Sequence, residues 1–226
     1  MSYIQPSLFG DGAREWPFGA LLPQSYDFLM ADPPWRFENY SELGQEKGPE
    51  PHYRTMADEE ILRLPVGDLA RENAVLWLWA TWPKLETALA AMRRWGFVYK
   101  TGGAWHKRLW GTGYIWRSQC EPVLIGTRGT PAINGRSIPN HFSEPRREHS
   151  RKPESAYAIA ERMMPRARRV SLFERPVRPG WDAWGDEVGV APGRKRPKRA
   201  KAQPPLIEVM GRADGGDHGH DLHRPD

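Results

Sequence analysis

Cysteine is almost missing from this 226-residue sequence, with Cys120 as its single representative. One thiol cannot form an intrachain disulfide and cannot supply a cysteine-based zinc cluster. A catalytic thiol is not favoured either, because a free cysteine is usually a small buried apolar residue. Such cysteine usage is typical of a reducing compartment, and we expect a cytoplasmic protein.

Long apolar runs are also missing. The longest, residues 74–80, is far shorter than the roughly 20 residues of a membrane-spanning helix. The first ten residues have neither a cationic start nor an apolar stretch, so we expect no secretory signal. These absences predict a soluble intracellular protein that does not use a membrane as a partner.

The sequence contains no nucleophile elbow and no clear cluster of metal-binding carboxylates. Hydrolase and nuclease functions are therefore set aside, and no metal is expected. Three histidines, His218, His220 and His223, are interpreted as incidental rather than as a metal site. The triplet 111–113 (GTG) does not complete a Gly-rich nucleotide-binding fingerprint.

Basic residues, in contrast, are plentiful: the net charge is +5 and the sequence pI is about 9.4. A basic balance attracts polyanions such as nucleic acids. Much of the charge lies in residues 194–201, which are either a solvated tail or a nucleic-acid contact. Because the sequence becomes polar and of low complexity after Gly189, we expect a domain over 1–189 and a disordered tail over 190–226.

Short apolar runs alternate with amphipathic segments. Strands are predicted at residues 26–31, 74–79, 103–107, 121–126 and 168–173. Helices are predicted after a capping box at 55–58, from Pro83 to Gly96 and from Pro153 to Pro165. This alternation indicates an α/β fold with a mostly parallel sheet, in which ligands bind beyond the carboxyl ends of the strands.

The tetrapeptide Asp32-Pro33-Pro34-Trp35 follows the first predicted strand, at such an end. The 6-amino group of adenine is a poor nucleophile because its lone pair is delocalised into the ring. Asp32 can accept one amine hydrogen, and the Pro33 carbonyl, held between residues of fixed φ, can accept the other. Trp35 can offer a ring face to a base flipped out of its helix. The structural alternative is a strand-terminating turn with an incidental tryptophan.

A long polar segment, residues 127–151, is the other candidate for function, because loops of this length are usually functional or disordered. Its second half combines basic side chains with an aromatic ring: Arg136, His141, Phe142, Arg146, Arg147, His149 and Arg151. Such a mixture favours phosphate contacts beside an extruded base. A merely solvated loop is the alternative.

Several blocks follow one another in a set order between residues 26 and 188. They are 30–35 (MADPPW), 52–56 (HYRTM), 76–81 (LWLWAT) with 105–107 (WHK), Trp116 with Glu121, 150–154 (SRKPE), and 172–176 (LFERP) with 180–187 (GWDAWGDE). In this order the blocks resemble the MT-A type of adenine methyltransferases, a family named for the catalytic subunit of the mRNA adenosine methyltransferase. Phage and bacterial members of that family modify DNA.

The resemblance implies a Rossmann-like methyltransferase fold with permuted motif order, in which the cofactor strand, here 168–173, comes near the end. It implies S-adenosylmethionine as the cofactor. The residues assigned to cofactor binding are Asp32, Lys152, Arg175, Asp186 and Glu187. The residues assigned to the nucleic-acid substrate are Tyr53, Trp116 and Glu121, joined by Arg146 and Arg147 of the basic segment.

Each assignment has a structural alternative. Lys152 could be a surface charge at a helix start, and Glu121 a buried structural carboxylate. Tyr53 and Trp116 could be packing residues, and Arg175 could pair with its neighbour Glu174.

We therefore expect an adenine N(6)-methyltransferase that acts on nucleic acid, with DNA favoured over RNA because the chain is short. A catalytically inactive nucleic-acid-binding partner of the same fold is the alternative, disfavoured by the intact catalytic tetrapeptide. Transfer to protein glutamine or to cytosine is disfavoured by Asp32, which such enzymes replace with Asn or Ser. The recognition sequence and the oligomeric state, a homodimer included, are left open.

Overall fold

The computed structural model describes residues 16–36, 55–111, 113, 115–134, 137–147, 151–173 and 178–185. The chain divides into two units, Met1–Ala191 and Pro192–Asp226, and every described residue belongs to the first. The disordered tail predicted over 190–226 lies outside the described residues and stays a prediction.

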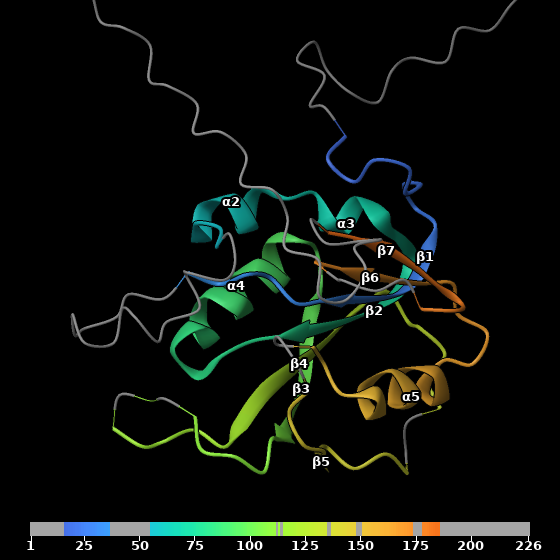
Figure 1. Cartoon of the computed structure of the whole chain (residues 1–226). Helices are drawn as coiled ribbons and strands as arrows, with labels where there is room; N and C mark the ends of the chain where they lie inside the picture. The colour runs from blue at the N-terminus through green and yellow to red at the C-terminus, as the bar shows by residue number, and fades with distance from the viewer. Residues whose placement is uncertain are drawn as a thin grey trace, which may run out of the picture. The chain divides into compact units, whose positions relative to one another are not determined.

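A seven-stranded sheet forms the centre of the described structure, in the order β5-β3-β4-β2-β1-β6-β7 (Figure 1). The strands are β1 (Tyr26–Ala31), β2 (Ala70–Trp79), β3 (Val98–His106), β4 (Cys120–Arg128), β5 (His141–Ser143), β6 (Arg169–Leu172) and β7 (Trp181–Trp184). Four of the six neighbouring pairs are parallel, and β4 is antiparallel to both β2 and β3. The predicted α/β fold with a mostly parallel central sheet is therefore confirmed.

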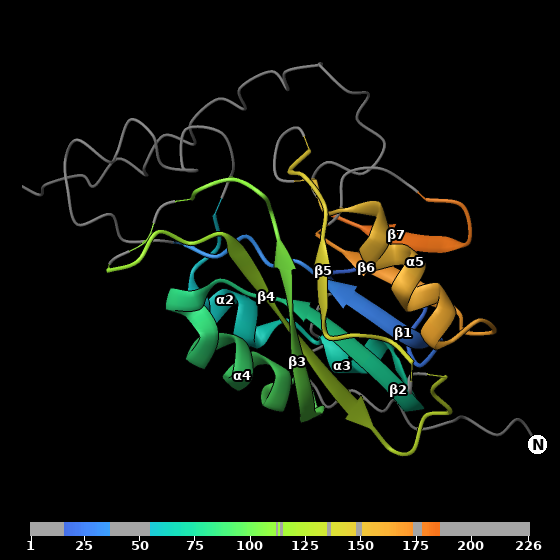
Figure 2. The same cartoon turned by 90° about the horizontal axis from the view of Figure 1, so that it is seen from below.

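Helices cover both faces of this sheet (Figure 2). They are α2 (Asp58–Arg63), α3 (Val66–Leu69), the 3₁₀ turn η1 (Trp82–Lys84), α4 (Leu85–Arg94) and α5 (Glu154–Met163). Helices α2 to α4 pack into one apolar cluster and α5 packs into another, on the opposite face. No helix in the described part of the chain is long and apolar enough to cross a membrane.

The central strands β1 and β2 are apolar along most of their length because both of their faces are buried. Leu29 and Leu76 pack on the side of α2 to α4, whereas Met30 and Trp77 pack on the side of α5. A strand buried on both faces reads as a continuous apolar run. The runs 26–31 and 74–79 were recognisable as strands for this reason.

The predicted capping box at 55–58 is wrong in its register. The N-cap of α2 is Ala57, whose N–H donates to Glu60 Oε2 at 2.9 Å. The carboxylate of Asp58 instead pairs at 2.8 Å with the Nζ of Lys84, the last residue of η1. A contact distant in sequence thus removes Asp58 from capping, and Glu60 takes its place.

Strand β1 lies at the point where the strand order reverses. From β1 the chain continues to β2 on one side, and β6 returns on the other side, parallel to both. Open α/β sheets bind ligands in the crevice beyond the carboxyl ends of the strands at such a switch point. Asp32 is the first residue after β1 and lies there.

Candidate active site

Sheet register brings the site to one edge. Ala31, the last residue of β1, pairs with Leu78 of β2 and Leu172 of β6, and Leu78 pairs with Leu124 of β4. The start of β4, including Glu121, therefore extends past the end of β1. Asp32 is tied to this edge by its own N–H, which donates to the Leu172 carbonyl at 3.3 Å.

The loop after β1 is held by backbone bonds and by the indole of Trp35. Trp35 N–H donates to the Pro33 carbonyl at 2.8 Å, and Met56 N–H donates to the Pro34 carbonyl at 3.0 Å. The Trp35 side chain is buried, and its Nε1–H donates to the Trp79 carbonyl at 3.2 Å. Trp35 therefore anchors the loop from within the core, which corrects the expectation of an open ring face for stacking.

Asp32 lies at one end of a row of alternating charges, and its side chain is one-third exposed. Lys152 Nζ lies 3.0 Å from Asp32 Oδ1 and also bonds to Glu121 Oε1. Glu121 Oε2 in turn accepts from Lys107 Nζ at 2.8 Å. The two carboxylates and two ammonium groups balance in charge, as buried ionic groups require.

The two inner groups of the row, Lys152 and Glu121, stabilise each other's charged forms. Burial by itself would lower the pKa of Lys152, but the carboxylates of Asp32 and Glu121 outweigh it and raise that pKa above its usual range. Burial by itself would raise the pKa of Glu121, but Lys152 and Lys107 outweigh it and hold that pKa below its usual range. Asp32 therefore faces a cation that remains charged, in a position fixed by folding.

Lys152 packs against an aromatic ring and lies just before helix α5. Its Nζ lies 4.8 Å from the ring centroid of Trp79, a cation–π contact at the end of β2. The following helix, α5, begins with the N–H groups of Glu154 and Ser155 donating to the carboxylate of Glu144, at 3.2 and 3.1 Å. The N-terminus of α5 is thus satisfied by the protein itself, and Lys152 supplies the positive charge beside Asp32.

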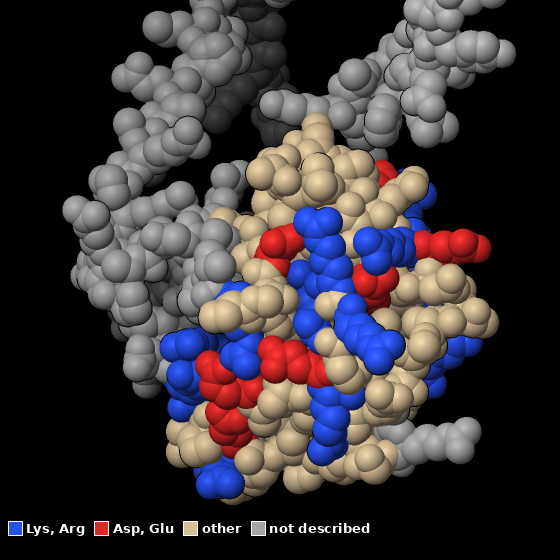
Figure 3. Space-filling view, turned by 90° about the vertical axis from the view of Figure 1, so that its right-hand side faces the viewer, with Lys and Arg blue, Asp and Glu red and all other residues tan. Residues whose placement is uncertain are grey.

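The structure brings Asp32, Lys152 and Glu121 together and leaves the predicted arginines apart from them. Arg147 pairs with Glu154 of α5, which also pairs with Arg151 and Arg178, whereas Arg146 is exposed. On the face that Figure 3 shows, basic and acidic side chains intermingle in this way. A phosphate bound by Arg147 would have to displace a carboxylate.

The other predicted residues fall into two groups. Trp116 lies on the loop between β3 and β4 and is 86% exposed, so it is not a packing residue. Tyr53, Arg175, Asp186 and Glu187 lie outside the described residues.

Sequence reasoning assigned no role to three residues at this edge. Lys107 completes the charge row, and Trp79 lies under Lys152. The Trp79 Nε1–H and the Thr81 hydroxyl are buried and have no hydrogen-bond partner among the described residues, which makes both candidates for ligand contacts. All three belong to blocks that carried the resemblance, and only the register of β2, β3 and β4 reveals their proximity.

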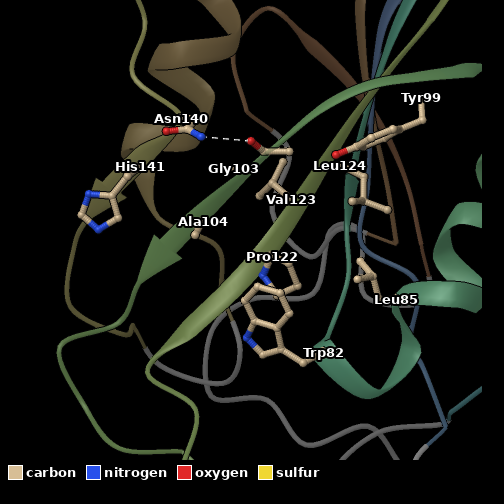
Figure 4. A pocket seen from close by; sticks show the side chains of 11 residues that line it. Trp82, Leu85, Tyr99, Gly103, Ala104, Pro122, Val123, Leu124, Asn140 and His141 are labelled. Carbon is tan, nitrogen blue, oxygen red and sulfur yellow. Dashed lines mark hydrogen bonds between the residues drawn. The ribbon is translucent and has the colours of Figure 1, made fainter.

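A shallow hollow of about 320 Å³ lies elsewhere, between η1 and the hairpin of β3 and β4 (Figure 4). Trp82, Leu85 and Tyr99 line it, and Asn140 bounds it by donating from Nδ2 to the Gly102 carbonyl at 3.4 Å. None of the predicted catalytic or cofactor residues that are described lines this hollow. We therefore place the candidate site at Asp32.

Comparison with known proteins is consistent with this geometry. The MT-A70 family model matches residues 26–187. The N(6)-adenosine-methyltransferase MT-A70-like protein of Arabidopsis thaliana is 32% identical over 200 residues, which are 82% of this chain and 27% of the plant protein. The catalytic subunit METTL3 of the human N(6)-adenosine-methyltransferase is 29% identical over 171 residues, which are 71% of this chain and 28% of that protein.

A relative of comparable length is the type II methyltransferase M.MunI of Mycoplasma sp. It is 27% identical over 194 residues, which are 76% of this chain and 83% of that protein. The chain thus spans less than a third of the plant and human relatives but most of M.MunI.

Proposed function

The chain belongs to the MT-A70 family, and we propose that it transfers a methyl group from S-adenosylmethionine to the 6-amino group of adenine in a nucleic acid, with DNA favoured over RNA. The observation that carries the proposal is the position of Asp32. Its carboxylate is one-third exposed at the switch point of the sheet and is held by a buried lysine.

Asp32 acts as a hydrogen-bond acceptor for the adenine amine. One carboxylate oxygen accepts an amine hydrogen, and the Pro33 carbonyl, which uses one lone pair for Trp35 N–H, accepts the other with its second lone pair. Two acceptors draw the amine nitrogen toward a tetrahedral shape and make its lone pair available for attack. The N–C bond would form as the S–C bond of the sulfonium breaks, which leaves a neutral thioether, and the methylated amine would then release one proton to the Asp32 carboxylate or to water. Lys152 keeps the carboxylate oriented, so that no reorganisation is needed during the reaction.

The residues beside Asp32 fit the amino-acid end of S-adenosylmethionine, which supplies a methyl group on a sulfonium. An amino acid offers one ammonium and one carboxylate, and Asp32 and Lys152 are the opposite pair, 3.0 Å apart. An ammonium group has three N–H donors, so Lys152 can bind the carboxylate of that amino acid with its third donor while it holds Asp32 and Glu121. Arg175, Asp186 and Glu187 are the further residues that we propose for the cofactor.

The preference for DNA is supported by how much of each relative the chain matches and by the resemblance to bacterial proteins. The relatives named as adenosine methyltransferases are more than three times longer than the segment matched here, whereas M.MunI is covered to 83%. The bacterial proteins that the sequence resembles modify DNA.

The test is methyl transfer from labelled S-adenosylmethionine to unmethylated DNA and, in parallel, to RNA. Digestion to nucleosides and mass spectrometry would then identify the modified base. N(6)-methyladenine from DNA in excess over RNA is expected. Transfer only to RNA would overturn the preference for DNA, and a chain that binds nucleic acid but not the cofactor would support the alternative of an inactive nucleic-acid-binding partner.

A further inference from the structure

The loop between β3 and β4, residues 107–119, carries an unusual share of exposed apolar surface. Nine large apolar side chains are exposed among the described residues, and four of them lie in this loop: Leu109, Trp110, Ile115 and Trp116. Trp110 is 65% and Trp116 is 86% exposed. Single exposed apolar residues are ordinary, but a group of four in one loop indicates a binding surface.

The loop continues the hairpin of β3 and β4, because backbone hydrogen bonds join its two sides. Beyond the strands, Lys107 N–H donates to the Gln119 carbonyl at 2.8 Å, and Gly111 N–H donates to the Ser118 carbonyl at 2.7 Å. A side chain at Gly113 would overlap the Trp116 carbonyl oxygen, so the two arms can approach this closely only with glycine there. The exposed rings are therefore displayed on an arm whose two sides are joined by backbone hydrogen bonds at Lys107 and Gly111.

The arm projects from the edge of the sheet that carries Asp32. Trp105 and His106, which precede the loop, pair with Glu121 and Cys120, which follow it, and the register places both pairs beyond the end of β1. Lys107, the first residue of the loop, is also the outer cation of the charge row. Whatever binds the loop thus lies next to the site.

The charge of the loop indicates the kind of partner. Residues 107–119 contain Lys107, Arg108 and Arg117 and no Asp or Glu. Arg108 bonds to the neutral Ser143 hydroxyl at 3.1 Å and Arg117 to the Gly111 carbonyl at 3.3 Å, so neither forms an ion pair with a carboxylate among the described residues. Exposed aromatic rings interleaved with arginines are the combination that binds unpaired bases and their phosphates.

We propose that this loop binds a single-stranded or locally opened stretch of nucleic acid beside the target adenine, with bases stacked on Trp110 and Trp116 and phosphates on Arg108 and Arg117. The inference rests on the proposed function, and it adds that the loop recognises unpaired bases. A ring can stack only on a base that has left its duplex neighbour, so intact duplex is bound less well through this surface.

The experiment measures binding without cofactor, by fluorescence anisotropy of a labelled single-stranded oligonucleotide and of its duplex. The double variant Trp110→Ala/Trp116→Ala should bind the single strand about tenfold to a hundredfold more weakly, with a smaller loss on duplex. Replacement of both by Phe should restore most of the affinity, because Phe also stacks. Arg108→Ala/Arg117→Ala should reduce the salt dependence of single-strand binding by about one to two counterions.

Matched controls come from the opposite end of the same hairpin. Tyr99 is an exposed aromatic residue at the start of β3, and Lys100 is its exposed basic neighbour. Tyr99→Ala and Lys100→Ala should bind both oligonucleotides as the unmodified chain does. Thermal unfolding of every variant establishes that the exposed substitutions leave the fold intact.

Unchanged single-strand affinity in the tryptophan variant would overturn the proposal. So would equal losses on single strand and duplex, or a change in self-association in place of a change in nucleic-acid affinity, which would make the loop a protein interface. Methyl transfer separates the two hypotheses. Loop-dependent binding without any transfer would overturn the proposed function alone, whereas transfer that is indifferent to the loop would overturn the loop assignment alone.

Discussion

Two clusters of charge, one around Lys152 and one around Glu154, are centred two residues apart in the sequence but differ in burial and in how their charges are paired. Around Lys152, the side chains of Lys152 and Glu121 are 8% and 10% exposed, and the charges alternate one by one. Around Glu154, the carboxylate is 45% exposed and is shared by Arg147, Arg151 and Arg178. Buried ions have to be matched individually, whereas exposed ones are screened by water. Burying the charges around Lys152 costs free energy that folding alone does not require, and we therefore place function at that cluster.

Replacing Lys152 by Met should have the largest effect. Asp32 and Glu121 would face each other without their cation, and loss of one partner from a buried pair typically costs about 3–5 kcal/mol. The free energy of unfolding in urea measures the stability loss, and we expect methyl transfer to be lost as well. Arg151→Met is the matched control, expected to cost less than about 1 kcal/mol because that side chain is 40% exposed. Equal losses would erase the distinction between the clusters.

Replacing Glu121 by Gln should come second, and its effect should depend on pH. The folded-state pKa of Glu121 is depressed, so its stabilising contribution is present above its ordinary pKa of 4.5 and is lost as pH falls through the folded value. The pKa of Lys152 is raised, so its contribution is present below 10.5 and is lost as pH rises through the folded value. Between these limits the contribution of Glu121 and Lys152 is constant.

From neutral pH downward, the free energy of unfolding should therefore fall less steeply with pH for Glu121→Gln than for the unmodified chain. The pKa of Glu154 is also lowered, first by the hydrogen bond from Arg147, but that carboxylate is exposed. Glu154→Gln should consequently change this pH dependence less than Glu121→Gln does. A larger change in Glu154→Gln would mean that the cluster around Glu154 contributes more to stability than the cluster around Lys152.

Replacing Lys107 by Met should have an intermediate effect. Its side chain is 25% exposed and holds Glu121 from the outer side, so the loss should be about 1 kcal/mol. Added salt should reduce this loss by screening, and it should affect the loss from Lys152→Met much less. Unfolding at low and high ionic strength checks both statements, and a salt-independent loss would mean that Lys107 is as sheltered as Lys152.

The smallest effect is expected for Glu154→Gln at neutral pH. Three arginines would lose an exposed partner, which changes the free energy of unfolding by less than about 1 kcal/mol. Methyl transfer should stay close to that of the unmodified chain. A loss of transfer without a loss of stability would instead give the arginine cluster the phosphate-binding role that the sequence suggested for Arg147.

The sequence was most informative where both faces of a strand are buried. Strand β1 was predicted with its observed bounds, because an unbroken apolar run ending at Asp-Pro-Pro permits little else. Strands β5 and β7 and the exposed first half of β3 were missed, since edge strands need few apolar residues. Their positions are set by pairing with β3, β4 and β6, which no local pattern encodes.

At the site, too, local sequence patterns predicted single residues but not the contacts that strand pairing creates. Asp32, Lys152 and Glu121 were predicted individually, but their contact depends on the register between β4 and its neighbours and on the approach of α5. Lys107 and Trp79 could not be assigned roles without that register. For Trp35, the sequence could not reveal that its indole N–H has a carbonyl partner in the core.

The central claim is that Asp32, held by Lys152, activates the adenine amine. The most direct test is Asp32→Asn, which keeps the size of the side chain but loses its charge, assayed for N(6)-methyladenine in DNA by mass spectrometry alongside unfolding and DNA-binding measurements. We predict a folded protein that binds DNA normally and transfers methyl groups at least about a hundredfold more slowly. Transfer within a few-fold of the unmodified chain would contradict the claim and move the search for the acceptor away from β1.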